Sequence, residues 1–275
     1  RWCPQAVVVA TPTALHLETA IPAARAGCHV LLEKPVSYNL TGVEDLRSAA
    51  AGSGSRVLVG FQFRYHPGLQ AIQQVLEQEA VGTLTAVRAH WGEYLPGWHA
   101  WEDYRQGYSA RADLGGGVVL TLCHPLDYLL WLLGDVVQVT AATSAQAGFG
   151  IDVEDSAQAA LTFASGALGG VHLNYVQRPP SHRLTVVGTD GTITWDQADG
   201  AARIFRAGAG AWEVSEAPAG YERNDMFAAE MKAFLDVVAG KATAEPSLAD
   251  GIRSLQLALA ILESARQGRR IDLTV

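Results

Sequence analysis

The sequence predicts a doubly wound α/β unit over residues 1–62, followed by an α+β unit over residues 63–275 that contains a large, mostly antiparallel open sheet. Two patterns separate these units. Up to about residue 60, apolar runs alternate with helix-like segments, which is typical of a parallel sheet. Beyond it, segments of alternating polarity follow one another at hairpin-like spacing. A chain of 275 residues is long enough for two domains that each bury a core.

The first unit contains one β-α-β crossover and the start of a second. Ala6–Ala10 is a β-branched apolar run of the kind that is buried on both faces of a parallel sheet. A helix over 14–26 and a strand at His29–Leu32 follow it. A second helix over 42–51 ends at a Gly/Ser turn, and Arg56–Phe61 forms the third strand.

The second unit begins with a helix over 67–78. Its expected strands are residues 85–94, 136–144, 156–163, 167–176, 183–188 and 192–196. Thr189-Asp190-Gly191 is a hairpin turn signal between the last two of them. Helices over 225–239 and 248–267 close the chain, and the second of these carries an apolar stripe.

Composition and charge exclude several classes of partner. A net charge of -8 at pH 7, without any Lys/Arg run, argues against nucleic-acid binding. The apolar stretches are far shorter than the roughly 20 residues that cross a bilayer, so we expect no membrane span. The N-terminus shows no apolar signal core, and the cysteines Cys3, Cys28 and Cys123 are typical of reduced thiols. We therefore expect a cytoplasmic protein.

Glu33-Lys34-Pro35 is the first candidate site motif, because it follows a buried strand at the sheet edge where α/β proteins bind ligands. Lys34 could donate a hydrogen bond to a hydroxyl group that is being oxidised. Partial burial would lower the pKa of Lys34 toward a useful value. The alternative is that Lys34 emerges into solvent and pairs with Glu33 or another carboxylate.

The second candidate is a polar stripe on the helix that Gly115-Gly116-Gly117 opens. Thr121, His124 and Asp127 recur at every third residue, and we expect them to share one face of that helix. His124 could move the proton of a substrate hydroxyl, while Asp127 orients the imidazole ring. The alternative is that His124 is a buried structural residue whose ring only forms a hydrogen bond with Asp127. No motif of metal-ligand spacing occurs, so we expect no metal.

The loop from Trp98 to Ser109 mixes aromatic and hydrogen-bonding side chains, which suits a polyhydroxylated ligand. The alternative is that its aromatic side chains only anchor the loop. Thr11-Pro12, Gln62 and Arg64 follow strand ends and are expected to line the same crevice.

Taken in order, four motifs resemble the Gfo/Idh/MocA family of oxidoreductases: Ala10-Thr11-Pro12 with His16, Glu33-Lys34-Pro35, Gly60-Phe61-Gln62-Phe63-Arg64, and Gly115-Gly116-Gly117 with His124 and Asp127. The resemblance implies that Lys34 and His124 act at the substrate carbinol. Relatives often carry Asp where Thr121 stands, with His four residues later rather than three, so Asp127 is expected to take the orienting role.

The resemblance also distributes the remaining residues between cofactor and substrate. Those expected at the cofactor, NAD or NADP, are Thr11, Pro12, His16, Glu33, Lys34 and Gln62. Those expected at the substrate are Arg64, Trp98, Tyr104, Arg105, Tyr108, Thr121 and His124. In relatives the glycine fingerprint for the pyrophosphate lies before the segment that matches Ala6, so we expect residues 1–62 to be the C-terminal half of a Rossmann domain.

The implied reaction is hydride transfer between the nicotinamide and a secondary alcohol of a sugar, an aminosugar or a cyclitol. Two alternatives remain at this point. One is an NAD-dependent glycoside hydrolase that uses transient redox chemistry, and the other is a non-enzymatic relative that acts as a binding or assembly module. By analogy we expect a homodimer or homotetramer that assembles through the C-terminal sheet.

Overall fold

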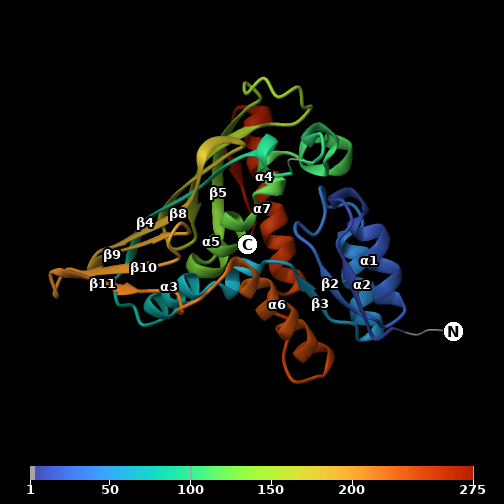
Figure 1. The fold of residues 1–275 in the computed structure, drawn as a ribbon, viewed down its shortest axis with the longest axis horizontal. Coiled ribbons are helices and arrows are strands. Elements are labelled where there is room, and N and C mark those ends of the chain that lie inside the picture. Colours follow the sequence, from blue (N-terminus) through green and yellow to red (C-terminus); the bar gives the residue numbers. More distant parts are fainter. Residues whose placement is uncertain (1–3, 100, 275) are drawn as a thin grey trace.

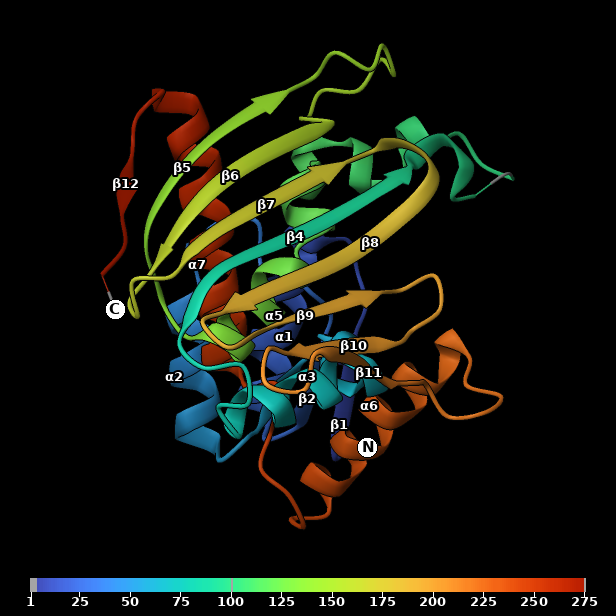
Figure 2. The ribbon, with the colours of Figure 1, turned by 90° about the vertical axis from the view of Figure 1, so that its left-hand side faces the viewer.

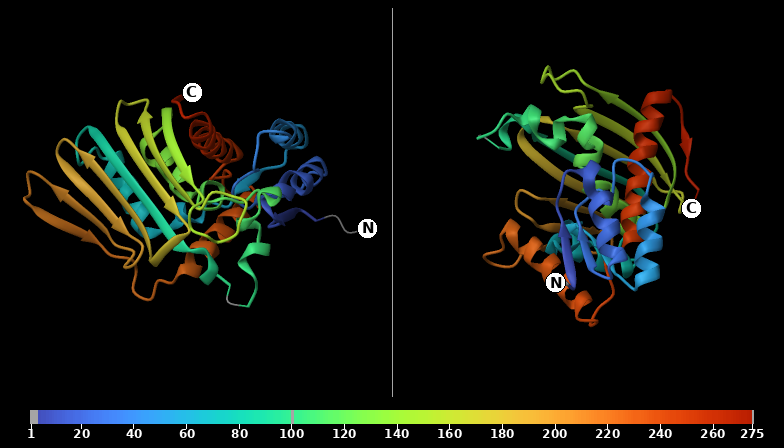
Figure 3. Two further views of the ribbon diagram at one scale, coloured as in Figure 1. Left: turned by 90° about the horizontal axis from the view of Figure 1, so that it is seen from above. Right: turned by 90° about the vertical axis from the view of Figure 1, so that its right-hand side faces the viewer.

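A computed structural model describes residues 4–99 and 101–274 and contains two sheets (Figure 1). The first has three strands in the order β1-β2-β3, and the second has nine in the order β11-β10-β9-β8-β4-β7-β6-β5-β12. Seen from above, they occupy opposite sides of the molecule, with α7 between them (Figure 3). This arrangement confirms the predicted fold class. Cys3 lies outside the described residues, while Cys28 and Cys123 are buried free thiols.

The first sheet is parallel throughout. Its strands are β1 (Ala6–Val9), β2 (His29–Leu32) and β3 (Val57–Val59). Val8 pairs with Leu31, and Leu31 pairs with Leu58, so the apolar runs lie side by side in the centre of the layer. The connecting helices α1 (His16–Arg25) and α2 (Val43–Ser53) cover one face (Figure 1).

The other face of the parallel sheet is covered from the far end of the chain. Helix α6 (Arg223–Val238) packs Phe234 and Val237 against Leu31 and Leu58. Before helix α7 (Leu248–Gln267), the carbonyl oxygen of Pro246 accepts a hydrogen bond of 2.9 Å from the backbone N–H of Val59. The α/β layer thus depends on segments that come long after residue 62.

The second sheet joins strands that are well separated in sequence. Its strands are β4 (Leu84–Tyr94), β5 (Val136–Ser144), β6 (Ser156–Phe163), β7 (Leu168–Asn174), β8 (Val176–Gly188), β9 (Gly191–Asp196), β10 (Ala202–Arg206), β11 (Ala211–Ser215) and β12 (Ile271–Asp272). Strands β4 and β7 run parallel, and the other described neighbours run antiparallel. Strands β10, β11 and β12 were not expected, because β11 is largely exposed and β12 spans two residues, so neither shows a clear apolar alternation.

One face of this sheet is buried and the other is open. In β6 the side chains of Ala157, Ala159 and Leu161 are buried, whereas those of Gln158 and Ala160 are exposed. Helices α3 (Pro67–Glu77), α5 (His124–Leu133) and α7 pack behind the sheet, and Figure 2 shows the opposite face turned toward the viewer. The period of two therefore places one apolar face on the core.

The expected helix after Gly117 is broken into α4 (Val118–Thr121) and α5. The segments Ala112–Thr121 and His124–Leu133 are bent by 48° relative to each other. In a continuous helix the carbonyl oxygen of Thr121 would accept the N–H of residue 125. Pro125 has no N–H, so this bond is missing and the chain turns at Leu122. The expectation that Thr121, His124 and Asp127 share one face of a single helix is therefore wrong.

Among the described residues, no single helix has the length and apolarity needed to cross a membrane. The bent pair of segments Ala112–Thr121 and His124–Leu133 passes that test together by length and composition. The residues of α4 and most of those of α5 are buried within the protein.

Helix α6 buries the carboxyl group of Glu230, and one of its oxygen atoms makes no hydrogen bond. Glu230 is 4% exposed, and its Oε1 has no hydrogen-bond partner. Burial, followed by the nearby charge of Glu33, raises the pKa of Glu230 to about 8. A carboxyl group with a raised folded-state pKa destabilises the fold progressively as the pH rises above its unfolded value.

We therefore predict that Glu230→Gln stabilises the protein much more at pH 8 than at pH 5, by about 3 kcal/mol of difference. The free energy of unfolding in urea at the two pH values measures this. The exposed Glu18→Gln is the matched control and should change stability by less than about 0.5 kcal/mol at either pH. An equal effect of Glu230→Gln at both values would show that Glu230 ionises normally.

Candidate active site

A cavity of about 400 Å³ lies where the carboxyl ends of β2 and β3 meet the second unit. Such an edge is where open α/β sheets bind ligands. Its walls come from β2, β3, β4, the loop after β4, α4, α5, the end of β9 and α6. The residues that line it are Glu33, Lys34, Gln62, Phe63, Trp91, Glu93, Trp98, His99, Tyr108, Thr121, Leu122, His124, Gln197, Arg223 and Phe227.

Lys34 follows β2 and crosses to the second unit. Its Nζ donates a hydrogen bond of 3.0 Å to the Thr121 carbonyl oxygen that Pro125 leaves free. Burial alone would lower the pKa of Lys34, but the surrounding acidic groups, of which Tyr108 contributes most, raise it above its ordinary value. The expected lowering was wrong. Lys34 is a stable ammonium group at neutral pH.

His124 begins α5 and is 2% exposed, enclosed by aromatic rings. Its ring centroid lies 4.9 Å from that of Phe63 and 5.6 Å from that of Trp91. Its Nδ1 is buried and has no hydrogen-bond partner among the described residues. Burial, followed by the positive charge of Lys34, lowers the pKa of His124 well below its usual range. The imidazole is therefore neutral at pH 7.

Asp127 does not orient His124, contrary to expectation. Its carboxylate accepts two hydrogen bonds from Arg64, of 2.9 Å from Nε and 2.6 Å from a terminal nitrogen. Arg64 also lies 3.5 Å from Asp250 and 5.6 Å from the centroid of the Trp131 ring. Burial raises the pKa of Asp127 to about 6, although Arg64 opposes this. Arg64 was expected to contact the substrate, but it is held by Asp127 and does not line the cavity.

The loop after β4 divides its predicted substrate residues into two groups. Trp98 and Tyr108 line the cavity. Tyr104 instead donates a hydrogen bond of 2.9 Å to the carbonyl oxygen of Phe149, and the exposed Arg105 binds Asp103 at 2.9 Å. Tyr104 and Arg105 therefore hold the loop in place, which corrects their assignment to the substrate.

The segment after β1 is organised by His16. The His16 ring is buried, with Nδ1 2.7 Å from the carbonyl oxygen of Pro35 and Nε2 3.0 Å from that of Thr11. Both ring nitrogens face backbone carbonyl oxygens, so His16 joins the segments that follow β1 and β2. Its expected contact with the cofactor stays a prediction. Thr11 and Pro12 lie at that edge, outside the cavity lining.

The strand ends fit a nicotinamide cofactor. Glu33, Lys34 and Gln62 line the cavity from the parallel sheet, and the Oγ1 atom of Thr11 is buried without a hydrogen-bond partner. An unsatisfied buried hydroxyl at a strand end is the kind of group that a bound ligand completes. Within the described part of the chain, no group of three or more His, Cys, Asp or Glu could hold a metal ion.

Several lining residues escaped prediction from the sequence. Trp91 and Glu93 stand two apart on β4, and Trp91 Nε1 donates a hydrogen bond of 2.8 Å to Glu93. Polar atoms on the buried face of a strand were the available signal. Gln197 and Arg223 come from the end of β9 and the start of α6, and no sequence pattern connects these positions with the parallel sheet. Phe63, His99, Leu122 and Phe227 complete the missed lining.

Family models cover most of the chain. Residues 3–61 match the model described as the oxidoreductase family, NAD-binding Rossmann fold. Residues 69–194 match the model described as the GFO/IDH/MocA C-terminal domain. The two matched regions contain most of the residues that line the cavity; Gln62, Phe63, Gln197, Arg223 and Phe227 lie outside them.

Individual relatives are similar over almost the whole chain. The chain is 27% identical to a 1,5-anhydro-D-fructose reductase of Ensifer adhaerens, over 98% of this chain and 79% of that protein. It is 26% identical to a levoglucosan dehydrogenase of Pseudarthrobacter phenanthrenivorans, over 97% of this chain and 79% of that protein.

Solved structures share the same arrangement of sheets. A levoglucosan dehydrogenase in complex with NADH and levoglucosan has a TM-score of 0.89 at 22% identity, covering 98% of this chain and 81% of that one. The WlbA dehydrogenase from Bordetella pertussis, in complex with NADH and UDP-GlcNAcA, has a TM-score of 0.83 at 28% identity, covering 98% and 79%. The chain therefore belongs to the Gfo/Idh/MocA family of oxidoreductases, and residues 3–61 belong to its NAD-binding Rossmann fold.

Proposed function

We propose that this protein transfers a hydride between NAD or NADP and a secondary alcohol of a sugar, an aminosugar or a cyclitol. The observation that carries the proposal is the meeting of Lys34 and His124, from different units, on one cavity wall. One is a stable cation and the other a neutral base. When bound at the strand ends, the nicotinamide accepts or supplies the hydride.

Lys34 and His124 have different roles at the substrate oxygen. The Lys34 ammonium donates a hydrogen bond to this oxygen and stabilises the negative charge that develops on it. The neutral imidazole of His124 takes the hydroxyl proton when the alcohol is oxidised and returns it when the ketone is reduced. Neither role requires Asp127, which is bound to Arg64.

The remaining lining suits a ring with several hydroxyl groups. Trp91, Trp98 and Tyr108 offer aromatic faces for C–H surfaces, and Glu93 and Gln197 offer hydrogen-bonding atoms. The names of two relatives, an anhydrofructose reductase and a levoglucosan dehydrogenase, support a sugar as the substrate.

We also propose that copies associate through the open face of the nine-stranded sheet to form a homodimer or homotetramer. The supporting feature is the size of this face, which no described helix covers and which carries Leu168 at 60% exposure. Sedimentation equilibrium gives the number of copies directly.

Lys34→Met is expected to lower kcat by about 10² or more, because the substrate oxygen loses its charged donor. Steady-state turnover with the preferred sugar and cofactor measures this, together with NADH affinity by fluorescence titration. The exposed Lys232→Met is the matched control and should leave both quantities unchanged. A kcat of Lys34→Met within threefold of the wild-type value would contradict the role of Lys34 as the charged donor to the substrate oxygen.

The pH profile of sugar oxidation tests the two ionisation states. The pKa of His124 lies well below 6.5 and that of Lys34 above 10.5, so kcat/KM should stay flat from pH 6.5 to about 10. His124→Asn should lower kcat by about 10² in the same range. An acidic limb centred at pH 6.5 or above in the wild-type profile would contradict a neutral, buried His124.

A further inference from the structure

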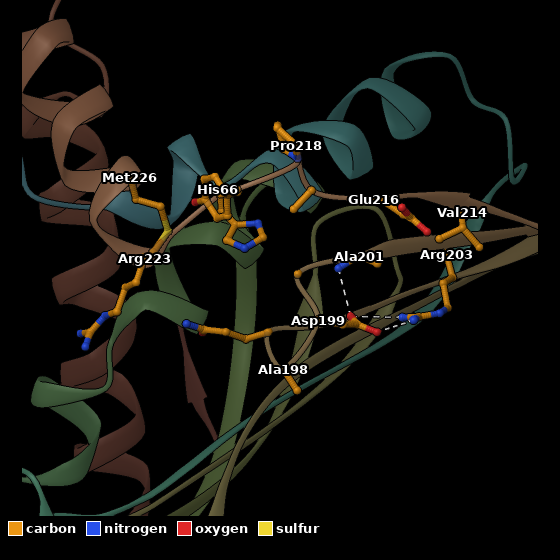
Figure 4. Close-up of a pocket in the computed structure, with 15 residues that line it drawn as sticks. His66, Ala198, Asp199, Ala201, Arg203, Val214, Glu216, Pro218, Arg223 and Met226 are labelled. Carbon is orange, nitrogen blue, oxygen red and sulfur yellow. Dashed lines mark hydrogen bonds and ion pairs between the residues drawn. The ribbon is translucent and has the colours of Figure 1, made fainter.

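A second cavity adjoins the active site. It has a volume of about 440 Å³ and lies between the turn after β9, the segment after β11 and the start of α6 (Figure 4). Gln197 and Arg223 line both cavities, so the two spaces share a wall at these side chains. The second cavity therefore lies next to the site at Lys34 and His124, with Arg223 and Gln197 between the two spaces.

Arg223 at this junction has no charged partner. Among residues 4–99 and 101–274, no carboxylate lies within the 4.0 Å of a salt bridge to it. The acidic neighbours Glu222 and Asp225 are engaged with backbone N–H groups in the capping box of α6. The guanidinium contacts only the Phe227 ring among aromatic groups, at 5.9 Å from its centroid. Arg223 is thus a cation available to a ligand.

The carboxylates of the second cavity do not bind Arg223. Asp199 binds Arg203 and accepts the backbone N–H of Ala201. Figure 4 shows this pair and Glu216 at the end of the cavity opposite Arg223. The positive charge of Arg223 reaches the active site, because it contributes to the lowered pKa of His124.

Cavity size favours an extended substrate. Ligand pockets typically measure roughly 300–1,000 Å³. The first cavity must hold the nicotinamide ring and the sugar ring that reacts, within about 400 Å³. A second space of similar volume, reached past an unpaired arginine, has room for a further group of the same molecule.

We propose that the substrate is an anionic sugar, whose carboxylate or phosphate is bound by Arg223 and whose remaining part occupies the second cavity. This inference rests on the proposed function, since it assumes that the sugar reacts at Lys34 and His124. Arg223 would act as a specificity residue, because its guanidinium can bind a carboxylate or a phosphate with two parallel hydrogen bonds.

The test is a calorimetric binding measurement with four probes: glucose, glucuronate, glucose 1-phosphate and UDP-glucose. The wild-type protein should bind at least one anionic probe about tenfold or more tightly than glucose, and Arg223→Met should abolish that difference. The exposed Arg266→Met is the matched control and should retain it. Glucuronate distinguishes a carboxylate from the phosphate of the other two anionic probes.

A second variant tests the extension. Ala198 is exposed and lines the second cavity, so the larger side chain of Ala198→Phe should fill part of this space. The variant should bind UDP-glucose more weakly and glucose 1-phosphate as tightly as the wild-type protein. Equal weakening of both would overturn the extension. Equal affinity of the wild-type protein for neutral and anionic probes, or unchanged binding by Arg223→Met, would overturn the anionic substrate.

Turnover with the same probes separates this inference from the proposed function. Anion-selective binding that depends on Arg223, but without cofactor reduction for any of the four probes, would contradict the proposed reaction at Lys34 and His124 and leave the anion site intact. If Arg223→Met unfolds, the wild-type affinity for the anionic probes should still fall with rising salt, because salt screens the attraction to the cations of the two cavities. Arg223→Gln, a second variant without the charge, then assigns the effect to Arg223 rather than to Lys34. A salt-independent affinity for the anionic probes would again overturn the proposal.

Discussion

The hydrogen bond from Lys34 to the carbonyl oxygen of Thr121 is the contact on which the active site depends. It exists because Pro125 has no N–H to offer that carbonyl, so the helix breaks and presents a free acceptor to the parallel sheet. The same break makes His124 the first residue of a new helix. One missing donor in the backbone therefore brings the ammonium and the imidazole, 90 positions apart in the sequence, to one cavity.

Local sequence patterns were sufficient to predict most of the fold and part of the lining of the candidate site. The apolar runs at β1, β2 and β3 and the alternation in β6 follow from burial on two faces or on one, so their existence could be predicted. Lys34, Gln62 and Trp98 could be predicted to line the cavity, because ligands of α/β proteins bind at strand ends and aromatic loops often border such sites. The predicted NAD-binding fold is confirmed by the family model over residues 3–61.

The predictions from the sequence were wrong where a residue far away in the chain determines the hydrogen-bond partner or the pKa of a site residue. Asp127 looks like a partner of His124 from its spacing, yet Arg64, 63 positions away, takes both carboxylate oxygens. The pKa of Lys34 rises because acidic groups from other elements surround it, and burial alone would have lowered it. Arg223 reaches the cavity through the return of α6 to the parallel sheet, and Gln197 reaches it from the end of β9; no local pattern encodes either arrangement.

That return also determines how the two units can move. The chain leaves the parallel sheet just after β3, at Gln62, and comes back beside the same strand, where Ser247 bridges to Leu58. One covalent connection, after Phe61, and one hydrogen-bonded contact, at residues 246–247, therefore flank β3. Any movement of the parallel sheet relative to the second unit must consequently either break the contacts of Pro246 and Ser247 with β3 or carry these residues along with the strand.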